Sequence, residues 1–265
     1  MVWLFFGLSG VAFAEEPPGN MEPGEFMETI QLKVLTLNIH SAINWYGQYD
    51  LDGLVRFIES VNPDLVGLQE VDRCWSGRSG FQDLPGELAL RLGMFSSYSV
   101  SLARNNGYFG NLILSKHPVN FMWADQLPGD LEQRSFIMAQ VNVNGVPVNF
   151  ITVHLGLSTG DRIRQVAAML QAAYPINGPL IIAGDFNAGP NDETIQPLRE
   201  NFIDVQEAAG VQQGTFRGRD GKTGQIMDYI FMTPEFGLLD FQIIDNYISD
   251  HLPLIATLSL RVFNP

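Results

Sequence analysis

Cysteine is nearly absent from this sequence: among 265 residues, only Cys74 carries a thiol. A single cysteine excludes an internal disulfide framework and a metal site built from several cysteines. We therefore expect Cys74 to be a small loop or core residue. The chain must owe its stability to a hydrophobic core, and its length is ample to bury one.

Positive charge is also scarce, with 15 Lys and Arg against 29 Asp and Glu, a net charge of −14. Five of the acids are glutamates in residues 1–30, which hold no Lys or Arg, so residues 31–265 carry −9. Proteins that bind nucleic acid without sequence preference need a basic surface. The acidic balance therefore disfavours a general nuclease, although a local basic cleft stays open as an alternative.

Long hydrophobic runs are limited to residues 2–14, VWLFFGLSGVAFA. This stretch is short for a membrane span and ends in Ala-Phe-Ala, which is typical of a secretory signal and its cleavage site. A basic start is missing, because Lys33 is the first positive residue. We predict a signal peptide at 1–14 and an exported protein, periplasmic or extracellular. The alternative is a membrane anchor formed by the uncleaved segment; no transmembrane segment is expected in the mature chain.

Low-complexity tracts, repeats and internal linkers are absent beyond residues 15–30, which are rich in Pro, Gly and Glu and predict a flexible linker. With 46% hydrophobic and 17% charged residues, the composition is that of a globular protein. Residues 31–265 are therefore predicted to form one domain, expected to be a monomer.

Strands and helices alternate along this domain. Apolar residues at helical spacing predict helices over 51–61 and 161–174, the latter with Ile163, Val166, Ala167 and Leu170 on one face. Asn144-Gly145 predicts a hairpin between strands 136–143 and 146–153, and Gly107 and Gly110 indicate a turn. The remaining predicted elements are strands at 31–39, 65–68, 98–102, 111–115, 180–183, 227–232 and 255–260, and a helix at 88–92. Hairpins exclude a purely parallel sheet.

Polar residues follow or precede these buried strands at several points: Asn38, Glu70, His154, Asp185, Asn187, Asp228, Asp250 and His251. Burial of such groups costs free energy unless something binds them. Several strand ends of this kind in one chain suggest a single shared site.

In chain order these strand ends read LTLN, GLQE, VHL, GDFN, MDYIF and SDHLP. The set resembles the endonuclease/exonuclease/phosphatase superfamily over residues 31–262, and within it the metal-dependent hydrolase branch. The resemblance implies the deoxyribonuclease-I-like fold, an α/β (α+β) four-layered sandwich of two packed mixed β-sheets flanked by helices. It also implies cleavage of phosphoester bonds with a divalent cation.

Glu70 is the first expected metal ligand, because Mg²⁺ prefers one or two carboxylate oxygens plus water and substrate phosphate. Without the other motifs, Glu70 would be interpreted as a helix-capping residue or as a surface acid in an ion pair. The resemblance adds Asn38, as a ligand or an orienting residue, and Asp250. Mg²⁺ is the expected metal, with Mn²⁺ as the alternative.

The catalytic roles follow from the resemblance. Asp185 would orient or deprotonate the attacking water, and Asn187 would contact a phosphoryl oxygen or fix Asp185. His251 would act on the phosphate as a base or a charged donor, with Asp228 holding its tautomer. His154 would be the second phosphate-binding histidine. The choice of base between Asp185 and His251 stays open.

Two further residues are candidates for substrate binding. Arg134 precedes a strand and could give a substrate phosphate bidentate contacts, although a surface ion pair explains it equally well. Asn111 follows a glycine-flanked aromatic pair and could line the cleft. Loop aromatic residues that could wall the pocket are Trp45, Tyr46, Tyr49, Trp75 and Phe81. His40 and His117 are expected to be solvent-facing or structural.

The leading hypothesis is a phosphoesterase that hydrolyses a small or lipid-linked phosphodiester by in-line attack of an activated water. An extracellular or periplasmic endonuclease is the nearest alternative, yet the loops contain only scattered Arg and Lys. A sphingomyelinase-like enzyme is another, but no apolar hairpin suits bilayer insertion. An inactive binding module of the same fold should have lost a catalytic residue, and none is missing. No paired-histidine zinc motif is present.

Overall fold

The computed structural model describes residues 27–263, so the predicted signal peptide and most of the predicted linker lie outside the described residues. Residues 27–30, predicted as linker, instead begin strand β1 (Met27–Asn38). They pair antiparallel with the last residues of β14 (Leu254–Phe263), and Ile30 is buried in the core. The predicted boundary was wrong because partners more than 200 positions away supply the hydrogen bonds of this short polar stretch.

Two six-stranded sheets form the centre of the molecule. The first has the order β13-β14-β1-β2-β4-β3 and the second β5-β6-β7-β8-β12-β9. The β1–β2 and β7–β8 pairs are parallel and their neighbours antiparallel, so both sheets are mixed, as predicted. The other strands of the first sheet are β2 (Leu65–Arg73), β3 (Phe95–Arg104), β4 (Gly107–Ser115) and β13 (Phe236–Ile243). The strands of the second sheet are β5 (Val119–Leu127), β6 (Arg134–Val143), β7 (Val146–His154), β8 (Leu180–Asp185), β9 (Ile203–Asp204) and β12 (Asp228–Met232).

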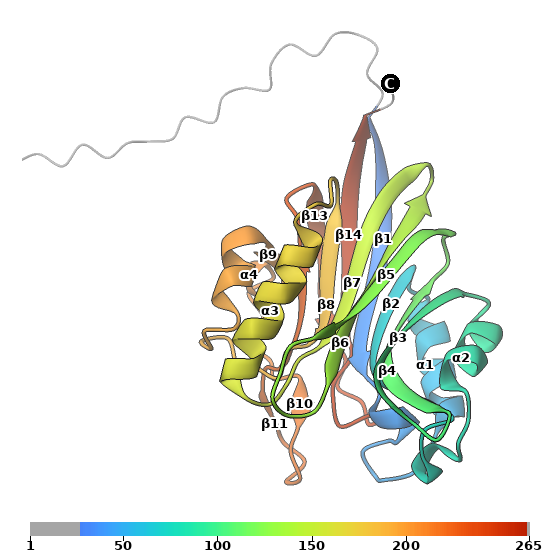
Figure 1. Ribbon diagram of the computed structural model, residues 1–265. Helices are drawn as coiled ribbons and strands as arrows, with labels where there is room; N and C mark the ends of the chain where they lie inside the picture. Colours follow the sequence, from blue (N-terminus) through green and yellow to red (C-terminus); the bar gives the residue numbers. More distant parts are fainter. Residues whose placement is uncertain (1–26, 264–265) are drawn as a thin grey trace, which may run out of the picture.

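Helices cover the outer faces of both sheets (Figure 1). One apolar cluster fills the space between the sheets, a second lies under α1 (Leu51–Val61) and α2 (Leu84–Leu92), and a third under α3 (Thr159–Ala173). This is the predicted four-layered sandwich. Short elements complete it: α4 (Gln196–Asn201), α5 (Val205–Ala208), a hairpin of β10 (Phe216–Arg217) and β11 (Thr223–Gln225), and 3-10 turns η1 (His40–Ala42) and η2 (Gly77–Ser79). Among the described residues, no helix is both long enough and apolar enough to cross a membrane.

Local sequence explains α1 well. The Asp50 side chain accepts the Gly53 N–H at 2.8 Å, an N-cap, and Asn62 ends the helix in the left-handed region. The buried face of α3 differs from the predicted one, since Ile163 is exposed while Arg162 and Gln165 are buried. Gln165 accepts the Gly156 N–H, and Arg162 binds Asp192, so these polar side chains turn inward to hold loops.

Glycine has two different uses near the hairpins. The β6–β7 turn has Asn144 and Gly145 at positive φ, as predicted. Gly107 and Gly110, however, lie inside β4, and the turn preceding it is Asn105-Asn106, also at positive φ. A Cβ at Gly110 would lie 1.9 Å from the Ser99 carbonyl oxygen, so β3 and β4 can approach this closely only because this position has no side chain.

Cys74, the single cysteine, is exposed directly after β2.

Candidate active site

The predicted polar residues converge at one end of the two sheets. His154, Asp185 and Asp228 stand opposite one another across β7, β8 and β12. Asn38 ends β1, and Gln69, the residue before Glu70, is its partner in the parallel β2. Because the carboxyl ends of parallel strands share an edge, side chains far apart in sequence meet here.

Asp185 is at the centre of the cluster. Its Oδ2 accepts a hydrogen bond from Asn38 Nδ2 at 3.0 Å and lies 3.3 Å from His154 Nε2 and 3.7 Å from His251 Nε2. The same Asn38 amide donates to Glu70 Oε1 at 3.1 Å. Glu70, Asp185 and His251 are therefore close enough to act on one common group.

The backbone at two of these residues has an unusual conformation. Glu70 has φ 56° at a bulge where the register between β2 and β4 shifts, and Asn187 has φ 48°. The Asn187 N–H donates to Asp185 Oδ1 at 2.9 Å. Positive φ at a residue other than glycine costs on the order of 1–3 kcal/mol and concentrates at functional sites. At Glu70 the bulge aims the carboxylate at Asn38.

Asp228 and His251 form a closely bonded pair. His251 Nδ1 lies 2.8 Å from Asp228 Oδ2, which also accepts the Thr215 hydroxyl at 2.6 Å. Thr215 Oγ1 accepts the Asp228 N–H, so its own proton is available for the carboxylate. Both His251 nitrogens thus face carboxylates. Burial opposes its protonation, but the charges of Asp228 and Asp185 outweigh burial and raise the pKa of His251 to about 10.

His154 is held by a partner that only donates. Arg134 NH1 lies 3.2 Å from His154 Nδ1, and because a guanidinium has no acceptor, Nδ1 must accept. The ring proton is then on Nε2, which lies 3.3 Å from the acceptor Asp185 Oδ2, while the nearby Asn187 Nδ2 donates to the Leu155 carbonyl at 3.0 Å. Burial, and then the positive charges of Arg134 and His251, hold the pKa of His154 well below its usual value. His154 is consequently a neutral donor.

The two predicted substrate contacts have other partners in the structure. Arg134 is buried behind His154 and pairs with Glu132 at 3.0 Å. Asn111 is buried, and its amide donates to the Ser135 carbonyl at 2.8 Å. Contact of either residue with substrate stays a prediction. Sequence inspection missed Thr215 and the orienting position of Arg134, because the contacts responsible join separate strands and loops.

The metal-side residues offer oxygen atoms at the mouth of the cluster. Glu70 and Asp250 are half-buried. Ser249 Oγ contacts both the Asn38 carbonyl at 2.7 Å and Asp250 Oδ1 at 3.2 Å. Asn38 Oδ1 accepts the His40 N–H, which leaves the amide NH₂ for Glu70 and Asp185. In this orientation Asn38 orients carboxylates, the second of its two predicted roles.

These residues fit a hard divalent cation, since Glu70 and Asp250 supply carboxylate oxygens and leave room for water and phosphate. The described residues also hold a buried cluster of possible ligands: Asp185, Asp228 and His251. Asp228 and His251 are already hydrogen-bonded to each other, which makes that cluster the poorer cation site.

The pKa of Asp185 is raised to about 6. Burial is the largest cause; the His251 charge lowers this pKa, and the Asp228 charge raises it further.

A cavity of about 490 Å³ adjoins the metal side. It is lined by His40 and Asp250, and further out by Trp45, Phe216 and Arg219. His40 Nδ1 is 3.8 Å from Asp250 Oδ1. Of the aromatic residues expected to wall the pocket, Trp45 lines this cavity, whereas Tyr49 lines another hollow with Gln82 and Arg91.

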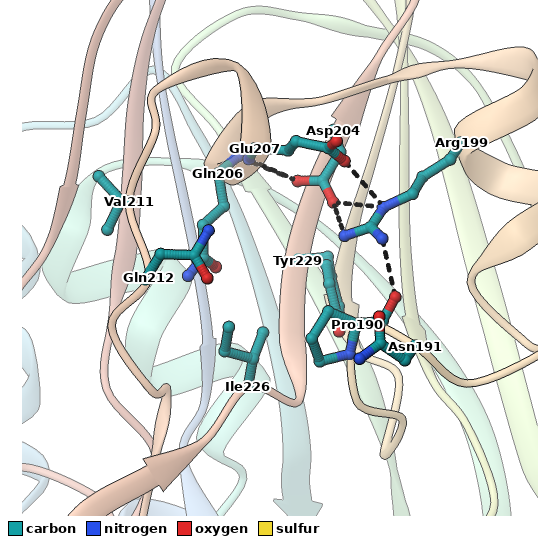
Figure 2. Close-up of a pocket in the computed structure, with 10 residues that line it drawn as sticks. All are labelled: Pro190, Asn191, Arg199, Asp204, Gln206, Glu207, Val211, Gln212, Ile226 and Tyr229. Atoms are coloured by element: carbon teal, nitrogen blue, oxygen red, sulfur yellow. Dashed lines mark hydrogen bonds and ion pairs between the residues drawn. The ribbon is translucent and has the colours of Figure 1, made fainter.

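A different hollow of about 250 Å³ lies between α4, α5 and β12 (Figure 2). Its only cation is Arg199, which donates to Asp204 Oδ2 and to the Pro190 carbonyl at 2.7 Å. Tyr229 at its base donates to the Ala188 carbonyl. None of the predicted catalytic or metal-binding residues lines this hollow, so it is not the reaction site.

The chain is similar in sequence to a known family and to curated proteins. The model of the Endonuclease/Exonuclease/phosphatase family matches residues 35–251. Tyrosyl-DNA phosphodiesterase 2 of Bos taurus is 28% identical over 166 residues, 60% of this chain and 42% of that protein. The Mus musculus enzyme of the same name is 25% identical over 237 residues, 78% of this chain and 60% of that protein. The chain thus spans about half the length of these curated relatives.

Among solved structures, an endonuclease/exonuclease/phosphatase from Beutenbergia cavernae DSM 12333 superimposes with a TM-score of 0.71. It is 24% identical, and the match covers 87% of this chain and 72% of that one. This likeness shows the fold. The family match spans most of the chain and includes every catalytic candidate from Asn38 to His251. The chain therefore belongs to the endonuclease/exonuclease/phosphatase family, whose members hydrolyse phosphoester bonds.

Proposed function

We propose that the protein is a Mg²⁺- or Mn²⁺-dependent phosphodiesterase. One observation carries the proposal: the Asp185 carboxylate lies within 3.7 Å of His154, His251 and Asn38, and Asn38 also binds Glu70. In the proposed roles, a base, two imidazole donors and a carboxylate for a cation surround one position. Hydrolysis of a phosphodiester requires such a set. The phosphodiesterase relatives support it.

In the proposed reaction the phosphate lies against the Nε2–H groups of His154 and His251 and the side chain of Asn187. His251 donates from both nitrogens and so cannot accept a proton. Asp185 is therefore the base that takes a proton from the attacking water. A cation held by Glu70 and Asp250 would neutralise charge on the phosphoryl and leaving oxygens.

We propose that the substrate is a small diester, because residues 31–265 carry a net charge of −9. We also propose that the protein is exported, because residues 1–14 are predicted to be a signal peptide. Two of the basic residues near the site are already engaged, since Arg217 binds Asp245 and Arg134 binds Glu132, which leaves Arg219 as the unpaired cation among these three within residues 27–263. A long polyanion would thus find little positive charge. Lipid-linked diesters and DNA remain as outcomes of the test.

Removal of divalent metal is expected to abolish hydrolysis of bis-p-nitrophenyl phosphate by the purified full chain. Added Mg²⁺ or Mn²⁺ should restore it, because the carboxylates alone repel the phosphate. Nitrophenolate release measured with EDTA, and after metal is added back, checks this. Supercoiled DNA and phospholipid vesicles assayed in parallel separate the nuclease and lipase alternatives. Full turnover in EDTA would refute the metal role.

Replacement of Arg134 by methionine is expected to lower kcat roughly tenfold, as loss of an orienting partner does. It should also steepen the acid limb that Asp185, as the base with a pKa of about 6, gives the rate profile. Burial and then the Arg134 charge hold down the pKa of His154, so removal of the charge raises that pKa, and protonated His154 then weakens Asp185 as a base as pH falls. Rates from pH 5 to 9 check this.

Arg134→Lys keeps the charge and is the matched variant, which should leave the acid limb unchanged. A purely structural role would lower the melting temperature of Arg134→Met with no change in the shape of the pH profile.

A further inference from the structure

The cavity beside Asp250 adjoins the reaction centre. His40 and Asp250 form one end of it, and Phe216 forms part of its wall. The Phe216 ring meets the His251 ring edge-on, with centroids 5.0 Å apart. A group in this cavity would therefore lie next to a phosphate held at His251. Its volume of about 490 Å³ suits a ligand of one or two rings.

An aromatic cluster fixes the outer wall of the cavity. The Trp45 ring lies 5.4 Å from the Tyr46 ring and 5.8 Å from the Tyr247 ring, and the backbone N–H of Trp45 donates to the Tyr247 backbone carbonyl at 3.0 Å. The Arg217 guanidinium stacks on Tyr247 at 4.4 Å. Trp45 is consequently held in place before any ligand binds, which reduces the entropy cost of stacking on it.

The arginine side chains that line the cavity bear on whether it can bind a phosphate ester. Arg217 is buried and occupied by Asp245 and the Asn246 carbonyl. Arg219 lines the cavity, is exposed and forms no ion pair with any residue in 27–263, so its cation is available to a ligand. Aromatic side chains stack on planar rings whatever substituents those rings carry. A nearby cation favours an ester that carries negative charge.

We propose that this cavity binds a planar ring carried by one alcohol of the phosphodiester, stacked on Trp45 and Phe216. The inference rests on the phosphodiesterase function proposed above and narrows its substrate class. A nucleobase and a phenolic ring share this chemistry, and the experiment distinguishes them.

The test compares three diesters in the presence of Mg²⁺. Bis(2,2,2-trifluoroethyl) phosphate has no ring, 2,2,2-trifluoroethyl phenyl phosphate has a phenolic ring, and thymidine 5′-(2,2,2-trifluoroethyl) phosphate has a base. Trp45→Ala is expected to lower kcat/KM for the ring-bearing esters roughly tenfold to a hundredfold, the loss of one stacking contact, and to spare the ringless ester. The ring-bearing ester that suffers the larger loss identifies the source of the ring.

Two variants serve as controls. Trp45→Phe keeps a stacking face and should retain most of the activity. Trp123→Ala removes a partly exposed tryptophan of β5, which packs against Phe136 of β6, and should change nothing. An equal loss with all three esters in Trp45→Ala would overturn the proposal.

Calorimetric binding separates this inference from the proposed function. Thymidine 5′-phosphate and phenyl phosphate are titrated against methyl phosphate, with wild type and Trp45→Ala. Tighter binding of a ring-bearing phosphate by wild type, lost in Trp45→Ala, supports the ring site even if no diester is hydrolysed. Ring-bearing phosphates that bind no tighter than methyl phosphate would overturn it.

Discussion

His251→Ala is expected to lower kcat for bis-p-nitrophenyl phosphate on the order of 10³-fold, the loss that follows removal of a charged donor from a transition state. The imidazole Nε2 faces Asp185, while Nδ1 is bonded to Asp228 at 2.8 Å. The substitution removes the donor and also the partner of a buried carboxylate. Steady-state kinetics with Mg²⁺ at saturating substrate measure the loss.

The stability cost needs its own control, because Asp228 would keep only the Thr215 hydroxyl. His251→Gln retains an amide donor for Asp228 and should melt close to wild type, yet it should be nearly as inactive as His251→Ala. His117→Ala, in the turn before β5, should have full activity. A His251→Gln variant with normal turnover would show that the histidine is structural.

Much of the fold could be predicted from local patterns. The apolar spacing and the Asp50 and Asn62 caps fix α1 at its predicted bounds, and Asn144-Gly145 fixes the β6–β7 turn. These signals depend on residues within a few positions of one another, so one sequence is enough to find them. The site residues could be found because buried strands end in groups that require partners.

Features that depend on contacts between distant segments could not be predicted. Strand β5 is an edge strand with an irregular, largely exposed sequence, and the sequence gives no alternating pattern to identify it. The tautomer of His154 depends on Arg134, 20 positions earlier, and the Asp228–His251 pair depends on Thr215. Each of these contacts exists only after the sheets have formed.

The site also shows a conflict between stability and chemistry. Most of the chain follows local preference, but Glu70 and Asn187 adopt positive φ and Asp228 Oδ1 is buried without a hydrogen-bond partner in the described structure. Such departures cost free energy and persist when function requires them. Other residues at positive φ, such as Asn62 and Asn144, end a helix or form a hairpin turn, whereas Glu70 and Asn187 lie at the proposed reaction site.

Glu70 allows this conflict to be measured directly. Glu70→Ala is expected to abolish EDTA-sensitive hydrolysis, a loss on the order of 10³-fold or more, because the cation would lose its main carboxylate. Glu70→Gly should be equally inactive but more stable than Glu70→Ala by about 1 kcal/mol, since glycine adopts the φ of 56° at this bulge without strain.

Urea unfolding of both variants, beside Glu59→Ala on the exposed side of α1 as a matched control, measures the difference in stability. A Glu70→Gly protein that is inactive and more stable than Glu70→Ala would show that the strained bulge is maintained for the carboxylate. Unchanged turnover in either variant would remove Glu70 from the metal site, whereas a Glu70→Gly variant that unfolds at a lower urea concentration than Glu70→Ala would assign the bulge to folding. The two measurements thus separate the chemical role of this residue from its structural one.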